Sequence, residues 1–202
     1  MFATKTEFPL GEALLHYERL TKDYTYPLKP VLEGLTFYTG KYNHYSVKRD
    51  QIWFHEHNRY INPDWPVYER WIPHEYPSQF IKLQNSISKR VNEVLRTTER
   101  DFLPNSLLLN RYNTGDNIIP QHQDSEIMFG DNPTVAVYSL GAKRIIRFTL
   151  ISDKTSITDI ELENNSLLIM AGTTQKYYYH ELLKDERVTD TRYSFTFRNH
   201  VL

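Results

Sequence analysis

Hydrophobic and polar residues alternate most regularly near the end of the chain, over residues 192–198. Tyr193, Phe195 and Phe197 fall on one face of an extended chain, which predicts a strand with that face in the core. The opposite face is polar and carries Arg192, Ser194, Thr196 and Arg198. The pattern alone leaves two interpretations of the polar face: it is solvated, or it lines a binding site.

Six more short apolar segments precede this strand. They cover residues 107–112, 134–140, 144–151, 157–162, 166–171 and 177–182. Turn-forming residues separate them, as in Asn113-Thr114-Gly115-Asp116 and Gly130-Asp131-Asn132-Pro133. Strands at this spacing predict an antiparallel sandwich or jelly roll.

Helical periodicity marks two stretches of the first hundred residues. The first stretch is formed by Leu10, Leu14, Tyr17 and Leu20. The second begins at Ser78, a candidate N-cap, and its apolar residues recur every three or four positions as far as Leu95. Residues 31–77 are rich in aromatic residues and prolines, so we expect short strands and long loops there. The elements together predict an α+β fold.

The composition allows one sizeable core and excludes several kinds of site. The chain has 202 residues, 40% of them hydrophobic, and no repeat or Gly/Ser linker divides it, so we expect a single domain over residues 1–202. It contains no cysteine, which excludes disulfide frameworks, thiolate zinc sites, iron–sulfur clusters and cysteine nucleophiles.

The charges nearly cancel, with 24 basic against 25 acidic residues, so nucleic-acid binding would need a local patch. We interpret the scattered cations Lys48, Arg49, Lys143 and Arg144 as solvated surface charges. No apolar run approaches the roughly 18 residues that a membrane span needs. We therefore expect a soluble protein without a secretion signal, in the cytoplasm or nucleus.

A candidate metal site begins with His122 and Asp124, whose i, i+2 spacing places both side chains on one face of an extended chain. His180 could be the third ligand, since alternation places it on one face with Tyr178 and Leu182. Two imidazoles and a carboxylate form the facial triad of non-haem iron oxygenases, which leaves coordination positions open. A surface turn with a charged pair, or a zinc hydrolase, would use the same residue types.

The two arginines of the last strand suggest what else such a site would bind. Arg192 and Arg198 lie about 20 Å apart along a straight strand, and long side chains leaning inward could bracket a small diacid. Their planar guanidinium groups match carboxylates bidentately and stay ionised. Asn110 and Tyr112 form a second same-face pair just ahead of the metal motif, with an amide and a phenol that can donate to a carboxylate.

Together these residues make the chain resemble the AlkB family of nucleic-acid dioxygenases. The resemblance covers residues 105–200 and rests on an ordered set: Asn110-Arg111-Tyr112, His122-Gln123-Asp124, Val137 to Gly141, Arg144 to Phe148, Ser166 to Met170, His180, Arg192 and Arg198. His180 lies 58 positions after His122, and Arg192 follows 12 residues later, which is similar to the family.

The resemblance implies a double-stranded β-helix (jelly-roll) catalytic core over residues 105–200. Residues 1–104 would supply N-terminal helices and a substrate-recognition region that resembles a nucleotide lid. His122, Asp124 and His180 would bind Fe(II). Arg192 would bind the distal carboxylate of 2-oxoglutarate, with Arg198 near its metal-bound end. Asn110, Tyr112 and Thr196 would complete the co-substrate pocket.

The reaction implied is O2-dependent conversion of 2-oxoglutarate to succinate and CO2, coupled to hydroxylation of an N-methyl group that then leaves as formaldehyde. The implied partner of this monomer is alkylated DNA or RNA, single-stranded or with a flipped base. Trp53 and Tyr60 resemble the aromatic pair of the family's lid, although core packing would explain them equally well. Ser125 departs from the acidic or basic residue often found there, and with Glu126 it bears on substrate choice.

Two alternatives stay open at this point. The first is a 2-oxoglutarate oxygenase that acts on a protein or a small molecule, for which the near-neutral charge gives mild support. The second is a jelly-roll binding protein that performs no oxidation. A complete set of three ligands and two arginines argues against the second alternative.

Overall fold

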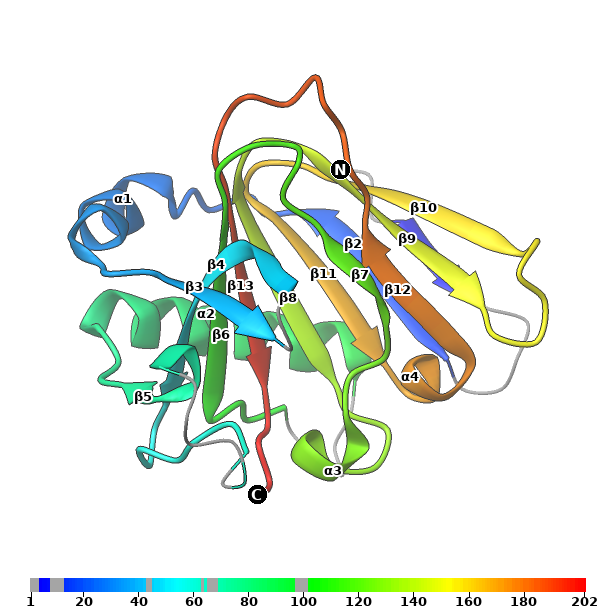
Figure 1. Ribbon diagram of the computed structural model, residues 1–202. Helices are drawn as coiled ribbons and strands as arrows, with labels where there is room; N and C mark the ends of the chain where they lie inside the picture. The colour runs from blue at the N-terminus through cyan, green and yellow to red at the C-terminus, as the bar shows by residue number, and fades with distance from the viewer. Residues whose placement is uncertain (1–3, 8–12, 43–44, 63, 65–68, 97–101) are drawn as a thin grey trace.

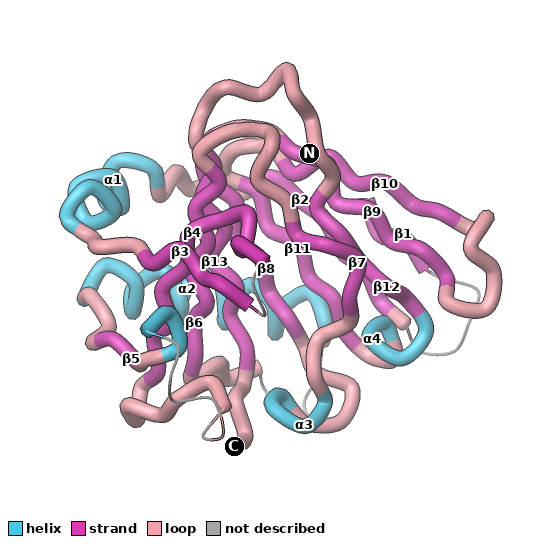
Figure 2. Tube along the Cα trace, viewed as in Figure 1, coloured by secondary structure: helices cyan, strands magenta, loops and turns pink. Residues whose placement is uncertain are grey.

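The computed structural model describes residues 4–7, 13–42, 45–62, 64, 69–96 and 102–202. Within these residues the chain forms two β-sheets, and helices accompany one of them (Figures 1 and 2). The larger sheet has the strand order β1-β2-β11-β8-β13-β6-β4-β3, with β5 beside β4. The smaller sheet has the order β10-β9-β12-β7. All pairings are antiparallel except that of β4 with β5.

The strands of the larger sheet are β1 (Thr4–Glu7), β2 (Leu14–Arg19), β3 (Tyr38–Tyr42), β4 (Tyr45–His55), β5 (Pro73–His74), β6 (Ser106–Tyr112), β8 (Val135–Gly141), β11 (Ser166–Ala171) and β13 (Arg192–Arg198). Those of the smaller sheet are β7 (Ile119–His122), β9 (Arg144–Leu150), β10 (Ile157–Leu162) and β12 (Tyr178–Leu182). The helices are α1 (Thr25–Gly34), α2 (Ser78–Leu95), α3 (Glu126–Phe129) and α4 (Thr174–Tyr177), with a 3-10 turn η1 (Glu69–Trp71).

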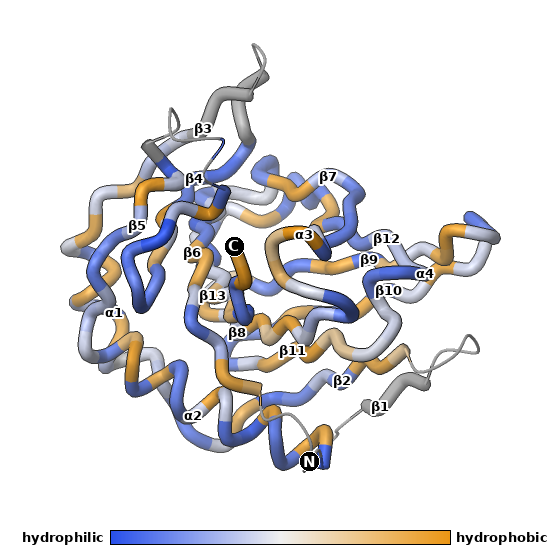
Figure 3. The backbone as a smooth tube through the Cα atoms, turned by 90° about the horizontal axis from the view of Figure 1, so that it is seen from below, coloured by the Kyte–Doolittle hydropathy of each residue, from blue (hydrophilic) through white to orange (hydrophobic). Residues whose placement is uncertain are grey.

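Three layers result: α1 and α2, the larger sheet, and the smaller sheet (Figure 3). One core lies between the helices and the larger sheet, where Phe80 and Ile87 of α2 pack with Phe195 and Phe197 of β13. A second core lies between the two sheets. Burying apolar side chains on both faces of the larger sheet stabilises the layers against each other.

Strand β13 is central and sets the positions of its neighbours' side chains. It pairs with β6 on one side and β8 on the other. In the β6 register, Arg192 lies opposite Tyr112 and Ser194 lies opposite Asn110. Since Phe195 and Phe197 point toward the helices, the alternate residues of β13 point into the space between the sheets. The polar face of this strand is buried there, so the solvated interpretation is wrong.

The seven strands expected between residues 105 and 200 are all present, within a residue or two at their ends. The helix expected to start at Ser78 is also confirmed as α2. Ser78 is its first helical residue, however, while Pro77 occupies the N-cap without a side-chain cap.

The helix expected around Leu14, Tyr17 and Leu20 is wrong. Residues 14–19 form β2, which pairs with β1 and β11 and buries Leu15, while Leu10 lies outside the described residues. The backbone hydrogen bonds and packing that residues 14–19 gain by pairing with β11 outweigh their weak helical periodicity, because tertiary contacts override local propensity. Helix α1 over residues 25–34 was not expected either, and β4 is longer than the short strands predicted there.

None of the described helices is long and apolar enough to cross a membrane.

Candidate metal centre and carboxylate-binding pocket

The pairing of β7 with β12 brings two histidines face to face. His122 and His180 are Cα partners in this antiparallel register, and their ring centroids lie 4.2 Å apart. His180 is buried, on the inner face that it shares with Tyr178 and Leu182, as the alternation predicted. Residues 58 positions apart in the sequence thus become direct neighbours across two strands.

Asp124 completes the group just after the end of β7. One ligand atom from each of His122, Asp124 and His180 lies within 4.8 Å of the others. The backbone N–H of Asp124 donates to Oε1 of Gln175 at 2.9 Å, which ties the segment to α4. Gln123 also donates from its side chain to the backbone carbonyl of Gln175. Two imidazoles and a carboxylate are therefore gathered in a geometry that could hold one metal ion.

The protonation states of this group suit metal binding. His122 has its Nδ1 2.8 Å from the Pro120 carbonyl, and because a carbonyl only accepts, Nδ1 carries the proton and the lone pair of Nε2 is free. Burial lowers the pKa of His180 to about 3 and also lowers that of His122. Both rings are therefore neutral near pH 7, as ligands must be.

Arg198, at the end of β13, donates to both carboxylate oxygens of Asp124. Burial alone would raise the pKa of Asp124, but the charge of Arg198 and its hydrogen bonds to the carboxylate favour the ionised form, and the pKa lies below its ordinary value. Asp124 is thus ionised while buried. Arg198 is its charge partner and fixes the orientation of its carboxylate.

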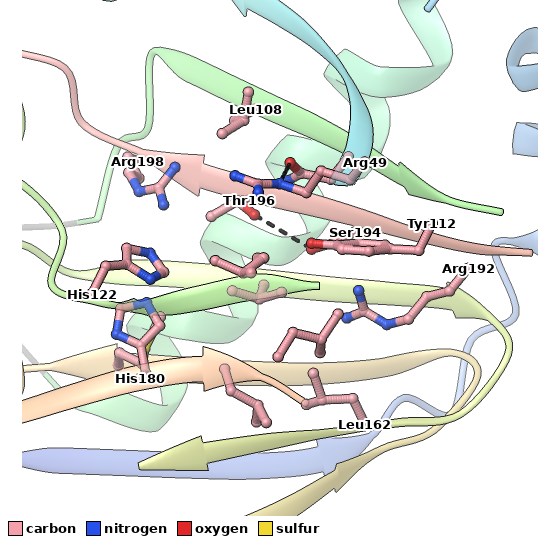
Figure 4. A pocket seen from close by; sticks show the side chains of 16 residues that line it. Arg49, Leu108, Tyr112, His122, Leu162, His180, Arg192, Ser194, Thr196 and Arg198 are labelled. Atoms are coloured by element: carbon pink, nitrogen blue, oxygen red, sulfur yellow. Dashed lines mark hydrogen bonds between the residues drawn. The ribbon is translucent and has the colours of Figure 1, made fainter. Parts of the chain in front are cut away.

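A pocket between the two sheets extends from this group toward the other end of β13 (Figure 4). His122, His180 and Arg198 lie at one end of it and Arg192 at the other. The walls combine apolar residues of both sheets with a smaller polar set that includes Asn110, Tyr112, Ser194 and Thr196. A ligand in this pocket would contact the proposed metal position and Arg192 at once.

Arg192 is a buried cation that pairs with no carboxylate of the described residues. It is 1% exposed, donates to Ser139 Oγ at 2.8 Å, and lies 5.2 Å from the Tyr112 ring centroid. Burial lowers its pKa to about 10, which still leaves it charged near pH 7. A buried cation is costly unless an anion compensates it.

Two buried polar atoms at this end also lack a well-aligned hydrogen-bond partner within the described residues, namely Arg192 Nε and the Tyr112 hydroxyl. Arg192 Nε can only donate and the Tyr112 hydroxyl is able to donate, so an acceptor group between them would satisfy both. Together with the metal-ligating set at the other end, they fit a molecule with a carboxylate at the Arg192 end and a second acceptor near the metal. The residues present therefore match a small dicarboxylate co-substrate.

The sequence model of one protein family, the 2OG-Fe(II) oxygenase superfamily, matches residues 32–198. The chain belongs to this superfamily. Membership, together with the histidine–aspartate–histidine group, establishes Fe(II), 2-oxoglutarate and O2 as its cofactors and co-substrates.

Relatives of the chain include AlkB homologues, which confirms the resemblance to that family. DNA oxidative demethylase ALKBH2 of Arabidopsis thaliana is 30% identical over 46% of this chain and 37% of its own length. Alpha-ketoglutarate-dependent dioxygenase alkB homolog 3 of Bos taurus is 31% identical over 53% of this chain and 40% of its own length. The chain thus spans well under half the length of these two relatives.

A solved structure described as "The structure of OsALKBH1" has a TM-score of 0.68 with this chain. The match covers 98% of this chain and 100% of the other at 17% sequence identity, so it bears on the fold. The expected α+β jelly-roll architecture of this oxygenase is confirmed.

None of the residues expected to contact substrate lines this pocket. Trp53 is 0% exposed, donates from Nε1 to the Arg59 carbonyl at 2.9 Å, and packs in a small core with Ile61, Leu108 and Phe129. This burial favours the core-packing alternative for Trp53 over the substrate contact. Tyr60 is exposed, at 39%.

Ser125 and Glu126 also stand apart from the pocket. Ser125 is the N-cap of α3, where its hydroxyl accepts from the Met128 N–H at 3.4 Å. Glu126 is exposed and lies 4.0 Å from Lys176. Neither residue is among those that line the pocket, nor are Trp53 and Tyr60. Their role in substrate choice stays a prediction.

Two of the four scattered cations are not solvated surface charges. Arg144 is 1% exposed and donates to the backbone carbonyls of Thr114, Gly115, Asn117 and Leu183. Arg49 of β4 lines the pocket. In the sequence, Arg49 has the i, i+2 spacing to Gln51 that places both on one strand face, and only the pairing of β4 with β6 reveals which face that is.

Proposed function

We propose that this oxygenase removes methyl groups oxidatively from N-alkylated bases in DNA or RNA. The observation that carries the proposal is the convergence of His122, Asp124 and His180 at one end of a pocket whose other end holds the uncompensated cation Arg192. The relative ALKBH2, a DNA oxidative demethylase, suggests alkylated nucleic acid as the substrate class.

In this proposal Nε2 of His122, a ring nitrogen of His180 and a carboxylate oxygen of Asp124 bind Fe(II). Arg192 and the Tyr112 hydroxyl bind the distal carboxylate of 2-oxoglutarate, while Asn110, Thr196 and Arg198 line the part of the pocket nearer the metal. When bound, iron and 2-oxoglutarate supply the oxidising power that turns an N-methyl group into an N-hydroxymethyl group, with succinate and CO2 as coproducts. The N-hydroxymethyl group then leaves as formaldehyde.

The protein's contribution is position and charge. Arg198 orients Asp124, Pro120 orients His122, and the apolar residues of both sheets keep water from the pocket. A base stacked inside a duplex cannot reach the metal position held by His122, Asp124 and His180. The substrate is therefore single-stranded or has a flipped base. We further propose that residues 1–202 act as a single, monomeric domain, in the cytoplasm or nucleus where nucleic acid is present.

The test is incubation with a panel of methylated DNA and RNA oligonucleotides, each single- and double-stranded, under iron, ascorbate and 2-oxoglutarate. Mass spectrometry would show loss of the methyl group, and succinate would be measured in parallel. The matched inactive control is D124N, which keeps the shape of the side chain but removes its charge. The proposal fails if the wild-type chain releases no methyl group from any oligonucleotide.

A second candidate function is oxygenation of a protein or a small molecule. The observations that favour it are the nearly balanced charge and the burial of Trp53 in a core. Substrate-independent succinate formation without demethylation of any oligonucleotide would favour this function. No succinate under any condition would instead favour a non-catalytic binding protein.

A further inference from the structure

Two residues of β4 contact the pocket residue Asn110, and no function has been assigned to either of them so far. Gln51 is the direct cross-strand partner of Asn110 in the pairing of β4 with β6. Arg49 lies two residues earlier on β4 and therefore on the same strand face. Figure 4 shows its guanidinium group reaching into the pocket beside Thr196, with Arg198 farther toward the metal end.

Both residues donate to the same atom. Arg49 Nε lies 2.9 Å and Gln51 Nε2 lies 2.8 Å from Asn110 Oδ1. Arginine has only donors, so the atom of the Asn110 amide that faces Arg49 must be the oxygen. The same reasoning then orients Gln51, which must present its amino group to that oxygen.

The orientation leaves the amino group of Asn110 for the pocket. Asn110 is 2% exposed, and within the part of the chain that the structure describes no hydrogen bond is formed by its Nδ2. If the Asn110 amide were flipped, its NH2 group would face the donors of Arg49 and Gln51. Both hydrogen bonds would then be lost, including the charge-assisted one from Arg49. The amide is therefore locked with its donor side available to a ligand.

Among the described residues, no carboxylate accounts for the partial burial of Arg49. Its Nη1 is 3.4 Å from the Ile118 carbonyl, and no carboxylate of the described residues forms an ion pair with it. Burial lowers its pKa, which is the expected response of a cation without a counter-ion. The stable, directional contact that it does make is the one to Asn110.

We propose that Arg49, together with Gln51, is a positioning residue for the co-substrate: it fixes the Asn110 amide so that Nδ2 donates to a carboxylate of 2-oxoglutarate. The inference rests on the proposed co-substrate site, since it assigns Asn110 one of the donors in that pocket. Arg49 acts through Asn110 and touches neither the metal nor the reacting methyl group.

The experiment is calorimetric titration of 2-oxoglutarate into the Mn(II)-loaded chain without oxygen, which needs no turnover and no nucleic-acid substrate. R49L should weaken 2-oxoglutarate binding about fivefold to tenfold, the effect of losing one net hydrogen bond. R49Q keeps an uncharged donor for Oδ1 and should recover most of the affinity. In the N110A background R49L should have little further effect, because a residue that acts through another shows no independent contribution.

Asn110 is tested by a variant that keeps its contact to Arg49. N110D still accepts from Arg49 and should remain folded, but it has no donor for the pocket and should bind 2-oxoglutarate even more weakly than R49L. R187L, which changes an exposed arginine paired with Asp185, is the matched control and should bind like the wild-type chain. Thermal unfolding of each Mn(II)-loaded variant checks that the chain is folded.

Three results would overturn the inference: unchanged binding in R49L, binding by R49Q as weak as by R49L, or additive losses in the R49L/N110A chain. The last two would show that the charge of Arg49 acts on the ligand directly. Failure of the wild-type chain to bind 2-oxoglutarate at all would instead remove the co-substrate site itself, which is a separate and recognisable outcome.

Discussion

Arg198 binds Asp124 through both carboxylate oxygens, with 3.0 Å from Nε to Oδ2 and 2.8 Å from Nη2 to Oδ1. Both side chains are at least nine-tenths buried, so the pair has little help from water. The same carboxylate is the proposed metal ligand. Arg198 therefore neutralises and orients Asp124 before any ion arrives, which ties the stability of the chain to its metal site.

Replacing Arg198 with leucine should destabilise the metal-free chain by about 3–5 kcal/mol, because it leaves a buried carboxylate without its partner. Saturating Mn(II) should reduce the loss, since the ion supplies positive charge to the same carboxylate. Urea unfolding with and without Mn(II) measures both. R147L breaks the more exposed pair with Asp159 and should cost about 0–1 kcal/mol. Equal losses in the two variants would contradict the role given to Arg198.

Replacing Arg192 with leucine should weaken 2-oxoglutarate binding roughly tenfold to a hundredfold, because a charge-assisted pair contributes about 1.5–3 kcal/mol. Y112F removes only the hydroxyl at this end of the pocket and should weaken binding by less. Calorimetric titration into the Mn(II)-loaded chain gives both dissociation constants. If R192L bound the co-substrate as tightly as the wild-type chain, the distal carboxylate would have to lie elsewhere.

Acid should destabilise the fold through a pair of buried histidines outside the metal centre. His55 and His200 are each 2% exposed, and their ring centroids lie 5.1 Å apart. Burial, with the nearby His200, His57 and Arg59, lowers the pKa of His55 from 6.5 to about 4, and burial also lowers that of His200. The folded chain therefore holds both rings neutral.

The sign of the effect follows from these directions. Between about pH 6.5 and pH 4 the unfolded chain takes up protons that the folded chain does not, so the free energy of unfolding falls as the pH falls through this window. Urea unfolding at a series of pH values should show this slope, and H55N should reduce it. H57N removes one neighbour that contributes to the lowered pKa of His55 and should change the slope much less than H55N does. An identical slope in H55N and the wild-type chain would contradict the assignment.

The sequence predicted the jelly-roll half of the fold well because its strands alternate and are separated by turn residues. The same alternation placed His180 on the inner face of β12 and Arg192 and Arg198 on one face of β13. These are local patterns with a period of two, and a sheet preserves them. The spacing of His122 and Asp124 also pointed to the metal group, although Asp124 lies just after the end of β7.

What could not be predicted depends on contacts between segments far apart. The spacing of Leu14 and Tyr17 predicted a helix, but these residues belong to β2. They pair with β11 of the larger sheet, and this contact cannot be seen in the local sequence. Arg49 and Arg144 looked like surface charges because nothing local shows that Asn110 and a cluster of backbone carbonyls surround them. Burial of a polar residue is a property of its neighbours, so a single strand carries no signal for it.

Trp53 and Tyr60 should now separate into a structural and a substrate-related residue. W53A removes a fully buried ring from the cluster with Ile61, Leu108 and Phe129. It should lower the free energy of unfolding, measured in urea, by about 3–5 kcal/mol.

Y60A changes an exposed side chain and should lower the free energy of unfolding by at most about 1 kcal/mol. If Tyr60 contacts the nucleic acid, Y60A should raise the KM for a methylated oligonucleotide and leave substrate-independent conversion of 2-oxoglutarate intact. L103A, which truncates an exposed apolar residue, is the control. A Y60A chain with an unchanged KM would exclude Tyr60 from the substrate contact, and a W53A chain as stable as the wild type would contradict the core position of Trp53.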